Sequence, residues 1–235
     1  MNTVIFDLDG TLLPMDQELF IKTYFKEWAK TIAPFGYLPE DFQKDVWVGT
    51  KAMLDNNGSM TNEERFWESF VKIYGEEVRE MEPEFHKFYL NEFSRAKVAI
   101  APAPLSDKCI KILKKKGYTV ALATNPLFPR VATLTRMGWA GLDPSDFEII
   151  TTYENSSFCK PKLEYYKNIL LELGKEANEC IMIGNDVRED MCVEDIGMDT
   201  YLLTDCLIDH GKDILKYRQG NFEDLYDFIN KLPEL

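Results

Sequence analysis

The stretch Val4–Leu13, which reads VIFDLDGTLL, determines how the rest of the chain is interpreted. Its apolar start predicts a short strand that is buried on both faces. Asp7, Asp9 and Gly10 follow where that strand should end. Two carboxylates so close to a core are costly unless a cation lies beside them. Because Asp and Gly are also common in ordinary turns, this stretch alone leaves a cation site and a plain acidic turn equally open.

Composition narrows the class of protein. A chain of 235 residues, of which 45% are hydrophobic, can build one large core with or without a smaller satellite. A net charge of -13 argues against broad binding to nucleic acids or anionic membranes, which requires clustered lysines and arginines. No apolar run approaches the length of a membrane span, and the first residues do not resemble a signal peptide. We therefore expect neither a nucleic-acid partner nor a membrane partner.

Cysteine and histidine usage predicts a reducing compartment and no zinc. The five cysteines are an odd number and contain no C-x-x-C pair. This pattern favours a cytoplasmic location over a disulfide framework or a zinc site. The two histidines, His86 and His210, fit no nucleophile or metal pattern, so we expect them to be ordinary surface or interfacial residues.

Residues 15–98 are predicted to be helical throughout. Apolar side chains recur at helical spacing, and breaks fall at Pro34–Gly36 and Asn56–Gly58. Thr61 and Glu64 have the spacing of a capping box at the start of a helix. Sixteen of the 30 aromatic residues lie in this segment, so we expect it to build a small core of its own. Such aromatic stripes more often serve packing than cofactor binding.

From Ile100 onward the pattern alternates between strands and helices, which predicts a doubly wound parallel sheet. Strands are expected over 118–123, 148–151, 180–183 and 199–203, with helices between them. Ligands of such sheets bind outside the carboxyl ends of the strands. Lys160 lies in a loop that can reach this edge. The side chains at the strand ends are those of Asp7, Asp9, Thr124, Asn125, Asp186 and Asp190.

Four of these segments, taken in order, resemble the motifs of one protein family. D-x-D-G-T, a strand ending in T-N, then K-P, then G-N-D-x-x-x-D are similar to the four motifs of the haloacid dehalogenase-like (HAD) hydrolase superfamily. The resemblance extends from Asp7 to Asp190. It implies an α/β fold with a Rossmann-like core over residues 1–14 and 99–235. The segment 15–98 would be an inserted all-helical cap of type 1, because it lies between the first and second motifs.

The resemblance also implies a role for each motif residue. Asp7 would be the nucleophile that forms an aspartyl-phosphate, which divides a slow displacement into two easier steps. Asp9 would protonate the leaving oxygen and then accept a proton from water. Thr124 and Lys160 would take part in catalysis, and together with Asn125 they would bind the phosphate.

A Mg²⁺ ion is the implied cofactor, since it prefers hard oxygen ligands and offsets charge near an anionic substrate. Asp7 and Asp186 would supply carboxylate oxygens, and Asp9 would supply its backbone carbonyl. Asp190 would support the metal indirectly, through water or a neighbouring ligand. Glu189 is adjacent to Asp190 and is an alternative for its role, as Lys162 is, more weakly, for that of Lys160.

The expected function is hydrolysis of a small phosphorylated metabolite. An acid at Asp9 favours phosphate-ester chemistry, because the dehalogenases and phosphonatases of the family lack it. A phosphomutase of the same fold shares these residues and is the second hypothesis, and a non-catalytic binder of phosphorylated ligands is the third. Substrate choice is expected on the inner surface of the cap, with Gly49–Lys51 and Asn56–Met60 as candidate loops or as plain surface turns. The sequence does not indicate an oligomeric state.

Overall fold

In the computed structural model, which describes residues 1–235, one parallel sheet forms the centre of the molecule. Its six strands lie in the order β3-β2-β1-β4-β5-β6, and every neighbouring pair is parallel. The predicted α/β class and parallel sheet are therefore confirmed. The strands are β1 (Thr3–Phe6), β2 (Thr119–Leu122), β3 (Ile149–Ile150), β4 (Cys180–Gly184), β5 (Asp199–Leu203) and β6 (Gln219–Gly220).

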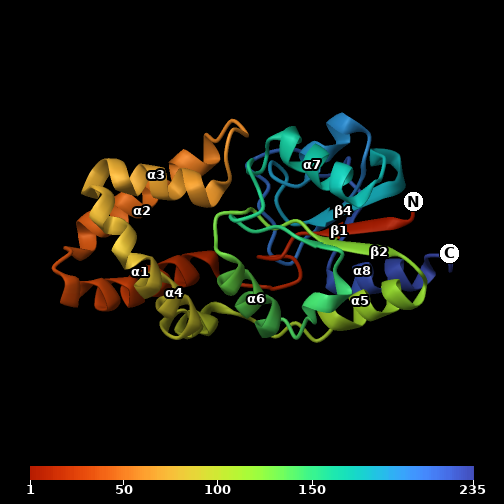
Figure 1. Ribbon diagram of the computed structural model, residues 1–235. Coiled ribbons are helices and arrows are strands. Elements are labelled where there is room, and N and C mark those ends of the chain that lie inside the picture. Colours follow the sequence, from red (N-terminus) through yellow and green to blue (C-terminus); the bar gives the residue numbers. More distant parts are fainter.

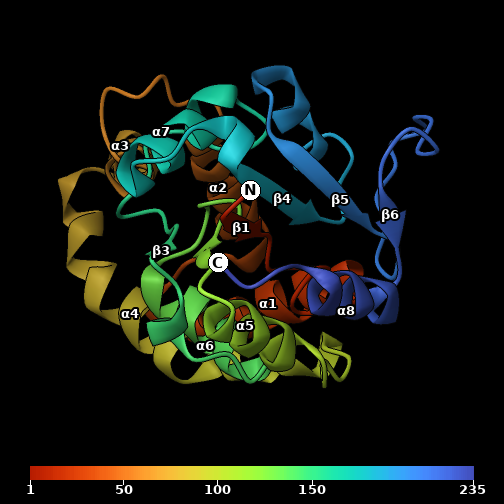
Figure 2. The same cartoon turned by 90° about the vertical axis from the view of Figure 1, so that its right-hand side faces the viewer.

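Helices cover both faces of this sheet, as the doubly wound pattern predicts. One face carries α5, α6 and α8, and the other carries α7 (Figures 1 and 2). Every residue of β1 is buried, because β2 and β4 flank it and helices lie above and below. The bounds of these helices are α5 (Ser106–Lys115), α6 (Arg130–Trp139), α7 (Leu163–Leu173) and α8 (Phe222–Lys231).

The helical insert, residues 15–98, lies beyond the carboxyl end of β1 and beside the sheet (Figure 1). Thr61 and Glu64 form the predicted capping box at the start of α3. None of the helices in the structure combines the length and the apolar character needed to cross a membrane. The elements of the insert are α1 (Gln17–Ile32), η1 (Ala33–Phe35), α2 (Pro39–Leu54), α3 (Asn62–Tyr74), η2 (Glu76–Met81), α4 (Glu82–Leu90) and η3 (Glu92–Ala99), the last of which extends one residue beyond it.

The insert does not have a separate core, contrary to our expectation. A single cluster of 41 buried hydrophobic residues includes Trp28 of α1 as well as Phe6 of the sheet. Aromatic contacts make the connection: the ring of Phe93 in η3 stacks on that of Trp139 in α6, with centroids 5.3 Å apart. The aromatic residues of the insert are numerous enough to pack against each other and against α6.

Three local features of the structure were not predicted from the sequence. The segment after Asp186 forms turns and a 3-10 helix, η6 (Met191–Ile196), where we expected a regular α-helix. The strand β6 was not foreseen, because two residues carry no periodic signal. The hydroxyl of Ser106, the first residue of α5, donates to the carbonyl of Leu12 at 2.7 Å and ties α5 to the turn after β1.

Replacing Trp28 by alanine should lower the free energy of unfolding by about 3–5 kcal/mol, the usual cost of emptying a large buried aromatic site. Trp28 is 1% exposed, and its ring stacks on that of Phe88 with centroids 3.9 Å apart. Trp47→Ala is the matched control, because Trp47 is 46% exposed. This control should cost about 1 kcal/mol or less. Urea unfolding followed by circular dichroism measures both, and equal losses would contradict the prediction.

Candidate active site

The candidate site begins where β1 ends. Asp7 follows β1 directly, and its amide donates to the carbonyl of Ile183 in β4 at 2.9 Å. Gly10 then turns the chain with a φ of +81°, a conformation that glycine adopts without strain. A side chain at Gly10 would also collide with Asn185, since a Cβ there would lie 2.5 Å from the Asn185 Nδ2 atom. The turn therefore requires glycine for two reasons: the backbone has a positive φ, and Asn185 leaves no room for a side chain.

Lys160 is the buried cation of the site. Its Nζ atom donates to Asp7 Oδ1 at 2.8 Å and to Asp190 Oδ1 at 2.6 Å. All three side chains are buried. Burial lowers the pKa of the Lys160 ammonium, but the facing charges of Asp190 and Asp7 raise it well above its ordinary value. Lys160 therefore stays charged and holds both carboxylates in place.

Asp190 and Glu189 have different partners, although both were candidates for one role. Asp190 Oδ2 accepts from the amide of Asp186 at 3.0 Å. It fills the space beside Gly184, where a Cβ would lie 2.1 Å from that oxygen. Glu189 instead accepts from the Asn125 amide at 3.1 and 3.2 Å. Burial raises the pKa of Glu189 to about 7. Only Asp190 contacts Lys160.

Asp9 is paired with a residue that the sequence analysis did not single out, Arg136 of α6. The guanidinium of Arg136 is fully buried, donates to Asp9 Oδ2, and lies 4.5 Å from the ring centroid of Phe128. The other oxygen, Asp9 Oδ1, is buried and has no hydrogen-bond partner. Burial raises the pKa of the Asp9 carboxyl, and the charge of Arg136 offsets part of that rise. An arginine among the apolar positions of a predicted helix was the available signal, since a buried arginine requires a partner.

Asp186 is fixed by main-chain amides and by a histidine. Asp186 Oδ1 accepts from the amides of Arg188 and Glu189 at 2.7 and 2.9 Å. His210 Nε2 lies 2.9 and 3.0 Å from the two carboxylate oxygens. His210 is exposed, as expected, but it is not an ordinary surface residue because it contacts the candidate site. No local pattern in the sequence indicated this contact, since 24 residues separate His210 from Asp186.

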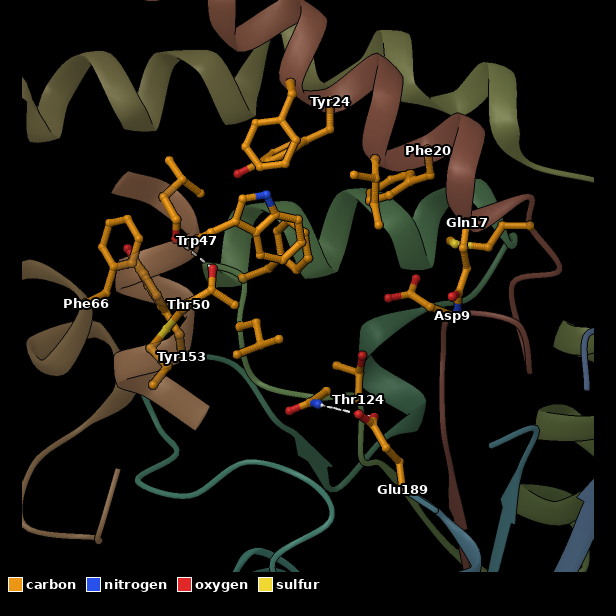
Figure 3. A pocket seen from close by; sticks show the side chains of 18 of the residues that line it. Asp9, Gln17, Phe20, Tyr24, Trp47, Thr50, Phe66, Thr124, Tyr153 and Glu189 are labelled. Carbon is orange, nitrogen blue, oxygen red and sulfur yellow. Dashed lines mark hydrogen bonds between the residues drawn. The ribbon is translucent and has the colours of Figure 1, made fainter. Parts of the chain in front are cut away.

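A cavity of about 400 Å³ connects these side chains with the helical insert. Figure 3 shows Asp9, Thr124 and Glu189 at one end, and Trp47, Thr50, Phe66 and Tyr153 at the other. Lys160 lies behind Asp7 and is not part of the wall. The predicted site residues that line the cavity are Asp7, Asp9, Thr124, Asn125, Asp186 and Asp190.

Of the two candidate segments on the insert, only Gly49–Lys51 reaches the cavity, and it lies within α2 instead of in the loop that we expected. Thr50 lines the cavity, whereas none of the residues 56–60 does. Asn56 instead donates to Asn62 Oδ1 and to the carbonyl of Met60, both at 2.9 Å. Lys162 donates to the carbonyl of Asn56 at 2.6 Å, so it does not compete with Lys160.

The oxygen donors at this edge fit a hard cation by their chemistry. No three His, Cys, Asp or Glu side chains form a ready-made metal cage. Mg²⁺ does not need one, since it typically uses one or two carboxylates together with water and substrate phosphate. Asp7 and Asp186 line the same cavity and supply such carboxylates, and Asp9, whose backbone carbonyl is the third candidate ligand, lies on the turn that follows β1.

Comparison with known proteins identifies the family. A family model described as haloacid dehalogenase-like hydrolase matches residues 1–191, which include all of the motif residues described above. The chain belongs to the haloacid dehalogenase-like hydrolases. The resemblance inferred from the motifs is thereby confirmed. Members of this family that act as phosphatases generally depend on a metal ion.

Individual relatives are distant but span nearly the whole chain. A glyceraldehyde 3-phosphate phosphatase from Methanocaldococcus jannaschii is 25% identical, over 99% of this chain and 94% of the relative. The pyrophosphatase PpaX from Bacillus pumilus is 24% identical, over 85% of this chain and 82% of the relative. A HAD phosphatase from Thermococcus onnurineus has the same fold, with a TM-score of 0.60, 17% identity and complete coverage of both chains. Together, the family and the phosphatase from Methanocaldococcus jannaschii support a phosphoric monoester hydrolase.

Replacing Lys160 by methionine should lower the free energy of unfolding by about 3–5 kcal/mol at neutral pH, because two buried carboxylates would lose their cation. Lys162→Met is the control, since it removes only one hydrogen bond, worth about 1 kcal/mol. Urea unfolding measures both variants. A Lys160→Met protein as stable as the control would show that the buried charges do not depend on Lys160.

Proposed function

We propose that this hydrolase is a Mg²⁺-dependent phosphatase that hydrolyses a small phosphate monoester through an aspartyl-phosphate on Asp7. The observation that carries the proposal is the placement of two carboxylates with different environments at one end of the cavity. Asp7 is paired with Lys160, whereas Asp9 has a free buried oxygen. A nucleophile must be held in place and a general acid must be able to hold a proton: the ion pair with Lys160 orients Asp7, and burial raises the pKa of the Asp9 carboxyl.

Asp7 is suited to attack phosphorus. Its Oδ1 atom accepts from Lys160, and its Oδ2 atom accepts from the hydroxyl of Thr11 at 3.2 Å. These contacts fix the orientation of the carboxylate at the cavity wall. Attack would form a bond between a carboxylate oxygen and phosphorus, while the bond from phosphorus to the leaving oxygen breaks. Lys160 would hold the Asp7 carboxylate in place and would act on the transferring group through that carboxylate, since it does not line the cavity itself.

Asp9 is suited to proton transfer. Burial raises the pKa of its carboxyl, which favours the protonated form needed to donate to the leaving oxygen. Once deprotonated, the same group would accept a proton from the water that hydrolyses the aspartyl-phosphate. Arg136 would act as a positioning residue, because it holds Asp9 Oδ2 and leaves Oδ1 without a hydrogen-bond partner, so Oδ1 is the oxygen that would carry the proton. Thr124 and Asn125 would bind the oxygens of the phosphoryl group.

The proposed cation ligands are the carboxylates of Asp7 and Asp186 and the backbone carbonyl of Asp9. A bound Mg²⁺ would supply positive charge that offsets the phosphate and the surrounding carboxylates. Asp190 would act indirectly, because its contacts are with Lys160 and with the amide of Asp186. His210 would have to share or leave the Asp186 oxygens when a cation binds there.

We also propose the division into a core of residues 1–14 and 99–235 and a cap of residues 15–98 that excludes water from the cavity. The two boundaries lie side by side, because the carbonyl of Pro14 at the first accepts from the amide of Ala101 at the second, at 2.9 Å. A cytoplasmic location agrees with the five free cysteines.

A phosphatase is favoured over a phosphomutase by the charge of the cavity. A mutase must bind an intermediate with two phosphates, so a second anionic group would lie away from the metal. No lysine, arginine or histidine lines the cavity to meet that group. A non-catalytic binder is disfavoured because such a protein has no use for both a nucleophile and a general acid.

Asp7→Asn should reduce turnover of p-nitrophenyl phosphate by roughly 10³-fold or more, because an amide is a poor nucleophile. The Asp227→Asn variant, altered at an exposed position on α8, should retain full activity. Stopped assays of released inorganic phosphate measure both, and circular dichroism checks that both are folded. Undiminished turnover in Asp7→Asn would rule out the assigned nucleophile.

Removal of divalent cations with EDTA should abolish turnover, and added Mg²⁺ should restore it, because the carboxylates of the site repel an uncompensated phosphate. The same assay with a sugar phosphate separates the reactions: a phosphatase releases inorganic phosphate, and a mutase yields an isomerised sugar phosphate. Activity that is unchanged in EDTA would contradict the proposed metal dependence.

A further inference from the structure

We propose that the preferred substrate is the phosphate ester of an uncharged aromatic alcohol, whose ring occupies the end of the cavity formed by the helical insert. This inference rests on the proposed phosphatase function and adds the chemical class of the leaving group. It is carried by three properties of the cavity: the aromatic composition of its wall, the absence of a cationic side chain, and the hydrogen bonds that three of its hydroxyl groups already make within the protein.

The wall of the cavity opposite the carboxylates is aromatic. Eleven of the 27 lining residues are Phe, Tyr or Trp, and nine of those belong to the insert. The distribution is polarised, since the acids lie at the sheet end and Trp47, Phe66 and Tyr153 lie at the other (Figure 3). A phosphate ester bound at Asp7 would therefore direct its leaving group away from the sheet and into aromatic surroundings.

Two large apolar side chains on this wall are still exposed to solvent. Trp47 is 46% exposed and Ile21 is 40% exposed, although both line the cavity. The ring of Phe25 packs against one side of Trp47, with centroids 5.6 Å apart, and is only partly buried itself. Exposed aromatic faces favour contact with another flat ring, by offset stacking or edge-to-face packing. A ligand ring would cover this surface.

Charge excludes a second anionic group on the leaving group. The lining side chains include five carboxylates, those of Asp7, Asp9, Asp186, Glu189 and Asp190, and no lysine, arginine or histidine. The two buried cations nearby, Lys160 and Arg136, are already paired with carboxylates. A carboxylate or a second phosphate would be buried without a partner, which is strongly unfavourable.

Three hydroxyls of the aromatic wall already have hydrogen-bond partners within the protein, which disfavours a sugar, and the one buried polar atom of the wall without a partner is Nε1 of Trp28. The hydroxyls of Tyr24 and Tyr89 are hydrogen-bonded to each other at 2.8 Å. The hydroxyl of Thr50 donates to the carbonyl of Val46 at 2.9 Å. Sugar hydroxyls that enter this region would lose water without gaining equivalent hydrogen bonds, whereas an aromatic ring has none to lose.

Two matched pairs of esters test the proposal in the presence of Mg²⁺, by the release of inorganic phosphate. Benzyl and cyclohexylmethyl phosphate have the same carbon skeleton but a flat aromatic ring in the first and a saturated ring in the second, and we expect a kcat/KM about fivefold higher for benzyl phosphate. The esters 4-methylphenyl and 4-carboxyphenyl phosphate differ in charge, and we expect at least about tenfold preference for the methyl compound. The carboxylate compound has the better leaving group, so such a preference would reflect binding.

Variants at the wall link these preferences to the cavity. Trp47→Leu should bring the benzyl and cyclohexylmethyl esters to nearly equal kcat/KM, because an apolar but non-aromatic side chain remains. Ile21→Lys should raise kcat/KM for 4-carboxyphenyl phosphate relative to the methyl compound, since it adds the missing cation. Val48→Ala is the control on α2: it is 49% exposed and does not line the cavity, so it should leave both ratios unchanged.

The outcomes separate the two proposals. If phosphate is released from glycerol phosphate or 4-carboxyphenyl phosphate as efficiently as from the uncharged aromatic esters, the leaving-group inference is wrong and the phosphatase function stands. If the wild-type preferences appear but persist in Trp47→Leu, the aromatic wall is not their source and the inference is likewise overturned. If no ester in the panel releases phosphate with Mg²⁺ present, the phosphatase function itself fails, and the inference fails with it.

Discussion

A lysine buried between two aspartates is the interaction on which the candidate site depends. Lys160 comes from the loop before α7, Asp7 from the end of β1, and Asp190 from the segment after β4. None of these charges would be stable alone at such depth, so each segment requires the other two. The arrangement joins three distant parts of the chain and at the same time orients the carboxylate that we assign as nucleophile.

The sequence was sufficient to place most of the site, because parallel strands bring their carboxyl ends to one edge. Asp7, Thr124 and Asp186 follow three different strands, and all three line one cavity. The capping box at Thr61 was equally readable, since it depends on residues three apart. The sequence therefore predicts those features that depend on a local pattern of residues or on the order of the strands.

Other features depend on tertiary placement that no local pattern reports. Arg136 meets Asp9 only because α6 packs against the site, and His210 meets Asp186 through a loop that follows β5. The choice between Asp190 and Glu189 was open in the sequence, because both carry a carboxylate and the sequence does not report in which direction each side chain points. The helical periodicity after Asp186 did not distinguish an α-helix from the 3-10 helix that forms.

The hydrophobic cluster shared by the insert and the sheet affects how this protein can be engineered. Phe93 of the insert packs on Trp139 and near Phe128, both of which belong to the sheet-bearing part of the chain. A chimera that exchanges residues 15–98 with those of a relative would cut through this packing. Such a graft would need to carry the facing surface of α6 with it, because the new helices would otherwise meet a surface shaped for different side chains.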